Sequence, residues 1–221
     1  MPTQKPVFEP PRDWEPVYAA SPACHFGEEP SQIARTAVRW FESFGGEASA
    51  SCVLDLGSGE GRDTAFLAEL GFSVTARDSA PTGLAKTRAL LARRGISESR
   101  LDLALGDVRE YGFPENHFDI ALAANVFQFL PPAEAPIYLE RLKAATEPGG
   151  ICAVGVFSPA MGAWGANISG FWTQTADDLL ARFAREDGWL ALDRTEYWTY
   201  REAEAMMASF AYVVARKELI K

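Results

Sequence analysis

The chain has 221 residues, of which 48% are hydrophobic and 23% are charged, proportions ordinary for a globular protein. This length suits one large domain better than two small ones, and it can bury an apolar core without disulfides or a structural metal. The net charge of -9 excludes a sequence-independent grip on DNA or RNA, because phosphate binding needs a surplus of Lys and Arg.

Neither the cysteines nor the start of the chain indicates an extracellular or metal-bound protein. Cys24, Cys52 and Cys152 lie far apart, with no C-x-x-C pair and no Cys/His cluster, so no disulfide framework and no metal site is predicted. The first residues lack the apolar segment of a signal peptide, and no apolar run reaches the roughly 18 residues of a membrane span. We therefore expect a cytoplasmic protein.

Residues 1–45 are predicted to form an N-terminal lid and helix that pack on a core of residues 46–221 within a single domain. Five prolines precede Tyr18, and they exclude a continuous helix there. Ser31 has the character of an N-cap, because apolar residues recur at helical spacing over residues 32–41. Aromatic side chains in the proline-rich part are expected to lie on an apolar surface: Trp14, Tyr18, His25 and Phe26.

From residue 52 onward, short apolar runs alternate with amphipathic helices. Continuous apolar strands separated by helices indicate parallel pairing with both faces buried, and right-handed crossovers then give a doubly wound α/β sheet. The last two strands have no helix between them, which indicates an antiparallel pair at one edge. The predicted strands cover residues 52–56, 72–76, 101–105, 118–124, 151–157, 189–198 and 209–217. The predicted helices cover residues 62–70, 81–94, 132–145 and 176–186.

The first strand runs into a glycine-rich loop. Asp55 is followed by Gly57, Gly59 and Gly61, and then by a helix. Glycine is needed where φ is positive or where a ligand approaches the backbone closely, and unpaired N–H groups gather at a helix N-terminus. Dinucleotide-binding enzymes carry G-x-G-x-x-G in this place. Here Arg62 occupies the position of the third glycine, which disfavours a nicotinamide-dependent oxidoreductase.

Acidic residues follow the next two strands. Asp78 can accept both hydrogen bonds of a ribose diol, although an acid there is also a common helix cap. Asp107 can accept a hydrogen bond from the exocyclic amine of adenine, and the Val108 N–H can meet a ring nitrogen, although Gly-Asp is also a common turn. Because ligands of such folds bind at the carboxyl ends of the strands, we expect these groups to converge.

These motifs, spread over residues 50–160, resemble the class I S-adenosylmethionine-dependent methyltransferases. The resemblance implies a seven-stranded, mostly parallel sheet with an antiparallel last strand and helices on both faces. It also implies that the chain binds S-adenosylmethionine and releases S-adenosylhomocysteine. The residues at the matching cofactor positions are Asp55, Gly57, Ser58, Gly59, Gly61, Asp78, Ser79, Asp107, Val108 and Asn125.

Within that family, residues 61–64, 72–76 and 214–217 are similar to the tellurite-resistance (TehB-type) group. The opening of the chain is loosely similar to the lid of thiopurine methyltransferases. The resemblance implies a small-molecule acceptor, either a soft thiol, selenium or tellurium nucleophile or a natural-product nucleophile, handled by a monomer or homodimer without nucleic acid or membrane. The alternative is a non-catalytic S-adenosylmethionine-binding or partner protein on the same fold.

No catalytic residue is assigned from the sequence. A soft nucleophile reacts as its anion without a dedicated base, whereas an oxygen acceptor usually needs one. Tyr18 and His25 are the candidates, because the N-terminal segment can fold over the site. The predicted acceptor pocket consists of aromatic residues from two separate segments: Trp14, Tyr18, Trp164, Phe171 and Trp172.

Overall fold

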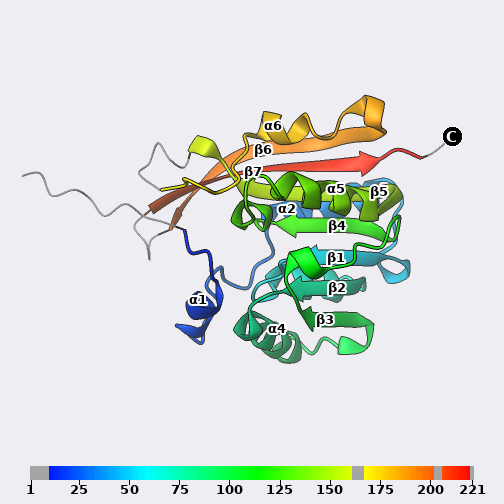
Figure 1. Cartoon of the computed structure of the whole chain (residues 1–221). Helices are drawn as coiled ribbons and strands as arrows, with labels where there is room; N and C mark the ends of the chain where they lie inside the picture. The colour runs from blue at the N-terminus through cyan, green and yellow to red at the C-terminus, as the bar shows by residue number, and fades with distance from the viewer. Residues whose placement is uncertain (1–9, 161–166, 202–205, 220–221) are drawn as a thin grey trace, which may run out of the picture.

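The computed structural model describes residues 10–160, 167–201 and 206–219. A single seven-stranded sheet runs through the chain in the order β3-β2-β1-β4-β5-β7-β6 (Figure 1). Neighbouring strands from β3 to β5 pair in parallel, and β7 pairs antiparallel with both β5 and β6. The predicted doubly wound α/β fold, with its antiparallel pair at one edge, is confirmed. No helix in the described part of the chain is long and apolar enough to span a membrane.

Three of the seven strands have the predicted bounds, those at residues 52–56, 101–105 and 118–124. The strands are β1 (Cys52–Leu56), β2 (Ser73–Asp78), β3 (Leu101–Leu105), β4 (Phe118–Ala124), β5 (Thr146–Phe157), β6 (Trp189–Arg201) and β7 (Met206–Lys217). The helices are α1 (Glu15–Ala19), α2 (Gln32–Ser43), α3 (Arg62–Glu69), α4 (Pro81–Arg93), α5 (Ala135–Ala145) and α6 (Ala176–Leu180).

The core lies on both faces of the sheet. Along β4, Ile120 and Leu122 pack with the buried residues of α2 and α3, while Ala121 and Ala123 pack with those of α5 and α6. Successive strand residues point to opposite faces, so a strand that is apolar throughout is buried on both sides. This arrangement explains why the central strands have continuous and not alternating hydrophobic patterns.

Several predicted boundaries were wrong. β6 ends three residues later and β7 begins three residues earlier than predicted, and β2 covers residues 73–78 in place of 72–76. β5 begins at Thr146 and not at residue 151, because Thr146 already pairs with Phe118 before the register shifts. α5 begins at Ala135 and not at residue 132, after a turn in which the Glu134 N–H donates to the carbonyl of Pro131. α6 ends at Leu180 and not at residue 186.

The early end of α6 has a packing reason. The amide of Phe183 donates to the carbonyl of Leu180 at 2.9 Å, the tighter bonding pattern typical of a helix end. This turn directs the Phe183 ring into the core, where it meets Trp189 edge-on with ring centroids 5.1 Å apart. Tertiary packing therefore ends a helix that the sequence pattern alone would continue.

The N-terminal segment lies against α4. Glu15, in α1, accepts hydrogen bonds from the backbone N–H and the hydroxyl of Thr82, at 2.9 and 2.5 Å. The one-turn helix α1 has Pro16 near its start, a position that proline tolerates because its missing N–H would be unpaired there. These contacts bring Trp14 and Tyr18 to the carboxyl end of the sheet.

Candidate functional site

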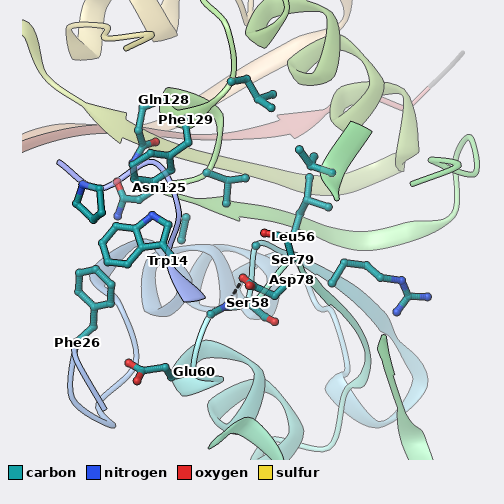
Figure 2. Close-up of a pocket in the computed structure, with 18 of the residues that line it drawn as sticks. Trp14, Phe26, Leu56, Ser58, Glu60, Asp78, Ser79, Asn125, Gln128 and Phe129 are labelled. Carbon is teal, nitrogen blue, oxygen red and sulfur yellow. Dashed lines mark hydrogen bonds between the residues drawn. The ribbon is translucent and has the colours of Figure 1, made fainter. Parts of the chain in front are cut away.

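One cavity of about 390 Å³ opens at the carboxyl ends of β1, β2, β3 and β4 (Figure 2). Nine of the ten residues predicted at cofactor positions line it: Asp55, Gly57, Ser58, Gly59, Asp78, Ser79, Asp107, Val108 and Asn125. Trp14 and Tyr18 of the N-terminal segment also line it. Residues far apart in the sequence therefore converge on one cavity. In open α/β sheets, ligands bind at this position, outside the carboxyl ends of the strands.

The tenth residue, Gly61, does not line the cavity. It has a φ of +83°, and a Cβ at this position would lie 2.4 Å from Cγ2 of Thr87. Gly61 therefore lets α3 and α4 pack closely. Gly57 (φ +68°) differs, because it lines the cavity and a Cβ there would lie 2.2 Å from Cγ2 of Val126.

Asp78 is held with its carboxylate at the start of the glycine loop. Its Oδ2 accepts a hydrogen bond from the Gly59 N–H at 2.7 Å, and its Oδ1 accepts one from the Ala80 N–H at 2.8 Å. Burial raises the pKa of Asp78, and these backbone donors oppose that rise. A carboxylate has about four acceptor sites, so Asp78 keeps capacity for a ligand hydroxyl.

Asp55 lies deeper, at the end of β1. It is 2% exposed, and its Oδ2 accepts a hydrogen bond from the Thr64 hydroxyl at 2.6 Å. Burial, followed by the neighbouring charge of Asp63, raises the pKa of Asp55 to about 7. The cavity therefore holds an acid whose charged form is disfavoured until an opposite charge or a higher pH stabilises it.

Asp107 is already engaged by its neighbour. Its carboxylate accepts hydrogen bonds from the N–H, Nε and Nη2 of Arg109, at 2.8, 2.9 and 2.6 Å. These bonds lower the pKa of Asp107. Arg109 thus takes three of the roughly four acceptor sites of the carboxylate, and the contact of Asp107 with an adenine amine stays a prediction.

Asn125 and Ser58 each bring a buried oxygen without a partner to the cavity. Asn125 has a φ of +62°, and its N–H donates to the Gly155 carbonyl at 2.9 Å. Neither Asn125 Oδ1 nor Ser58 Oγ has a hydrogen-bond partner among the described residues. Buried polar atoms normally have partners, and each exception calls for an explanation such as a ligand.

Trp14 and Tyr18 of the N-terminal segment form one side of the cavity. Tyr18 is 6% exposed, and burial, followed by the charges of Asp78 and Glu60, raises its pKa. Its phenol therefore stays protonated, which disfavours a role as general base. Trp14 stacks on Tyr18 with ring centroids 5.6 Å apart. Glu60 ties this segment to the glycine loop, because it accepts hydrogen bonds from the His25 N–H and from Lys86.

The catalytic candidate His25 and several predicted pocket residues do not line the cavity. His25 packs against Trp14 and Phe26 but is not among the residues lining the cavity. Phe171 packs behind the lining, against Phe129 and Phe157. Trp172 is not a lining residue, because it is buried in the core on the α5 and α6 face of the sheet. Trp164 lies outside the described residues.

The sequence did not predict much of the aromatic lining of the cavity. Phe26, Phe129, Phe157 and Phe210 line the cavity together with Gln128.

Among the residues that the structure describes, no group of three or more His, Cys, Asp or Glu side chains is arranged to hold a metal ion.

Comparison with known proteins agrees with this geometry. Residues 53–150 match a family model described as a methyltransferase domain, and the match spans the glycine loop, Asp78, Asp107 and Asn125. Residues 53–150 are therefore similar to a methyltransferase domain, and the motifs and the strand order agree with the class I type.

Curated relatives of this methyltransferase domain are similar over part of the chain. The carboxy-S-adenosyl-L-methionine synthase of Chromohalobacter salexigens is 35% identical over 45% of this chain and 37% of its own length. The probable S-adenosyl-L-methionine-dependent methyltransferase TehB of Haemophilus influenzae is 31% identical over 44% of this chain and 33% of its own length. The chain spans about a third to a half of the length of the first curated relatives that it matches.

A solved structure extends the likeness beyond the methyltransferase domain. It belongs to work on the conversion of a disulfide bond into a thioacetal group during echinomycin biosynthesis, and it superposes with a TM-score of 0.64. The alignment covers 94% of this chain and 92% of the other at 23% sequence identity. This neighbour therefore shares the fold across nearly the whole chain.

Proposed function

We propose that this chain binds S-adenosylmethionine in the cavity and transfers its methyl group to a small-molecule acceptor. The observation that carries the proposal is the convergence of four strand ends on one cavity, with a glycine loop and Asp78 at its centre. The relatives support the choice of cofactor, because one of them is named as a probable S-adenosyl-L-methionine-dependent methyltransferase.

The residues present fit the proposed cofactor. Asp78 has acceptor sites for a ribose diol, and Ser79 and Val108 line the same side of the cavity. The unpartnered oxygens of Ser58 and Asn125 are acceptors suited to the ammonium of the amino acid end. We therefore assign the ribose to Asp78 and the amino acid end to Ser58 and Asn125.

S-adenosylmethionine supplies an electrophilic methyl group on a sulfonium. The chain contributes position, because a fixed cavity holds both reactants in line, and such alignment is worth up to about 7–11 kcal/mol. Trp14 and Tyr18 cover the cavity and exclude water. We propose that residues 1–45 act as the lid of this site, since Glu15 and Glu60 tie that segment to the residues around the cavity.

The acceptor is proposed to be a soft thiol, selenium or tellurium nucleophile or a natural-product nucleophile. The raised pKa of Tyr18 supports an acceptor that is nucleophilic without a base. The structural neighbour belongs to work on the conversion of a disulfide bond into a thioacetal group, and this context of sulfur chemistry supports the same class.

Calorimetric titration with S-adenosylmethionine and S-adenosylhomocysteine tests the cofactor, and mass spectrometry of mixtures with thiols, selenite, tellurite and hydroxyquinolones tests the transfer. We expect micromolar binding and a methylated product with at least one acceptor. Binding without any product would favour the non-catalytic alternative. Absence of binding to both cofactor forms would contradict the proposal.

A further inference from the structure

Gln128 is a polar side chain buried without a hydrogen-bond partner. It is 0% exposed, and neither its Oε1 nor its Nε2 has a partner among the described residues. Its backbone carbonyl is satisfied by the N–H of Trp172 at 3.2 Å. The unpaired groups are therefore confined to the carboxamide, which carries one acceptor and one donor function side by side.

Gln128 lies at the cavity and not in a distant part of the core. Gln128 is a lining residue, and it follows β4 in the short turn that also holds Phe129. Figure 2 shows Gln128, Phe129 and Trp14 at one end of the pocket, away from Asp78 and Ser79. The same view places Asn125 beside Gln128, so the carboxamide lies away from the proposed ribose residues and next to the proposed amino acid end of the cofactor, where an acceptor would approach the methyl group.

Aromatic rings surround this end of the cavity. We call them the aromatic wall: Trp14, Phe26, Phe129, Phe157 and Phe210, all of which line the cavity. Within the wall, Phe129 meets Trp14 and Phe157 nearly edge-on, with ring centroids 5.5 and 5.6 Å apart. Aromatic rings favour edge-to-face and offset contacts with a further flat ring.

An unpaired buried amide is costly when nothing binds it. Leaving a buried donor or acceptor unsatisfied incurs its full desolvation penalty, so an aliphatic residue of the same size would suit a purely structural position better. A ligand with a neighbouring N–H and C=O satisfies both groups of Gln128 in one planar, paired contact. A lactam has such an adjacent N–H and C=O, which can pair with the carbonyl and the NH2 of the carboxamide.

We propose that Gln128 is a specificity-determining residue, and that the acceptor is a planar aromatic or heteroaromatic molecule whose adjacent donor and acceptor pair with its carboxamide. The inference rests on the proposed function, because it places the acceptor beside the cofactor. To the proposed function, the inference adds two properties of the acceptor: a flat ring system, and an edge with an adjacent hydrogen-bond donor and acceptor.

Three bicyclic probes of similar size separate ring packing from edge recognition. Carbostyril presents an adjacent N–H and C=O, quinoline presents an acceptor alone, and naphthalene presents neither. Each is titrated by calorimetry into protein saturated with S-adenosylhomocysteine. We expect carbostyril to bind at least about tenfold more tightly than either analogue, since a site built for a hydrogen bond rejects a ligand that lacks it.

Gln128→Leu keeps the volume and removes the amide. We expect this variant to bind the three probes within about threefold of one another and to unfold at a higher temperature than the wild type, because a buried unpaired amide is gone. Ser209→Ala is the matched control. The Ser209 hydroxyl is also buried without a partner in the described part of the chain, but Ser209 does not line the cavity.

The Ser209→Ala variant should keep the preference of the wild type for carbostyril. The inference is overturned if wild-type protein binds carbostyril no better than naphthalene or not at all, or if Gln128→Leu keeps the preference. A separate titration with S-adenosylhomocysteine distinguishes failure of the proposed function. Should that ligand not bind, the three probes are titrated into the protein alone and judged by the same criteria.

Discussion

At the scale of single residues, the proposed ribose contact depends on Asp78. Its carboxylate is fixed by the N–H groups of Gly59 and Ala80, so it is oriented before any ligand arrives. Asp78→Ala is expected to weaken S-adenosylhomocysteine binding by at least ~1 kcal/mol, because it removes a charged acceptor for the ribose. Calorimetry measures this change.

Asp187→Ala is the control for loss of one negative charge, because Asp187 is exposed and does not line the cavity. It should bind S-adenosylhomocysteine as the wild type does. An unchanged affinity in Asp78→Ala would remove Asp78 from the ribose site.

Asp55 predicts a pH dependence of stability. Its pKa rises from 3.8 to about 7 in the folded chain, so folding favours the protonated acid. The stability that Asp55 contributes is present below its unfolded pKa and is lost as pH rises toward the folded pKa. Between about pH 5 and about pH 8, the free energy of unfolding of Asp55→Asn should therefore gain at least ~1 kcal/mol relative to the wild type.

Chemical denaturation at several pH values measures this difference. Asp187→Asn, at an exposed acid, should show a constant difference from the wild type over the same range. A constant difference for Asp55→Asn as well would mean that Asp55 does not ionise within that range.

The sequence predicted Asp78, Gly57 and Asn125 at the cavity because each stands at or directly after the end of a strand, and strand ends meet at one edge of the sheet. It did not predict Gln128 as a lining residue, because lack of a hydrogen-bond partner is a property of the folded chain. It also did not predict that Arg109 holds Asp107, since a pair two residues apart forms only when the turn brings the side chains together.

At the scale of elements, the start of α2 is joined to α3 through a buried cap. The Ser31 hydroxyl accepts a hydrogen bond from the Ala34 N–H at 3.2 Å and donates to Asp63 Oδ2 at 2.7 Å. Ser31→Ala should lower the free energy of unfolding by ~1–2 kcal/mol, because the cap and a buried partner are both lost. Urea denaturation measures the loss.

Ser43→Ala, at the exposed end of the same helix, is the matched control and should change stability by less than about 0.5 kcal/mol. Equal effects of the two substitutions would argue against a special role for the buried cap.

The lid segment yields a prediction about dynamics. Glu15 fixes α1 on α4 through two hydrogen bonds to Thr82. Glu15→Ala should release α1, and the amide of Tyr18, which donates to the Trp14 carbonyl, should exchange with deuterium at least about tenfold faster. Glu110→Ala, at an exposed acid, should leave this rate unchanged. An unaltered rate in Glu15→Ala would show that other contacts hold α1.

Periodicity predicted most elements because the central strands are continuously apolar and the helices amphipathic. It failed at element ends. The start of β5 depends on pairing between Thr146 and Phe118, and the end of α6 depends on the contact of Phe183 with Trp189. Both are long-range interactions that a local pattern does not encode.

At the scale of the whole molecule, the fold provides the position of the site and the side chains around it provide the chemistry. The doubly wound sheet and the glycine loop are predicted from the sequence, and both agree with the match of residues 53–150 to a methyltransferase domain. The aromatic wall is not predicted, because it joins Trp14 to Phe210 from opposite ends of the chain. The identity of the acceptor is thus encoded mainly in contacts between distant segments.

The most direct test is a crystal structure of the chain with S-adenosylhomocysteine. The account predicts the ribose hydroxyls within hydrogen-bond distance of the Asp78 carboxylate, the amino acid end beside Ser58 and Asn125, and the sulfur facing the aromatic wall. A ligand bound with its ribose away from Asp78, or bound outside this cavity, would contradict it.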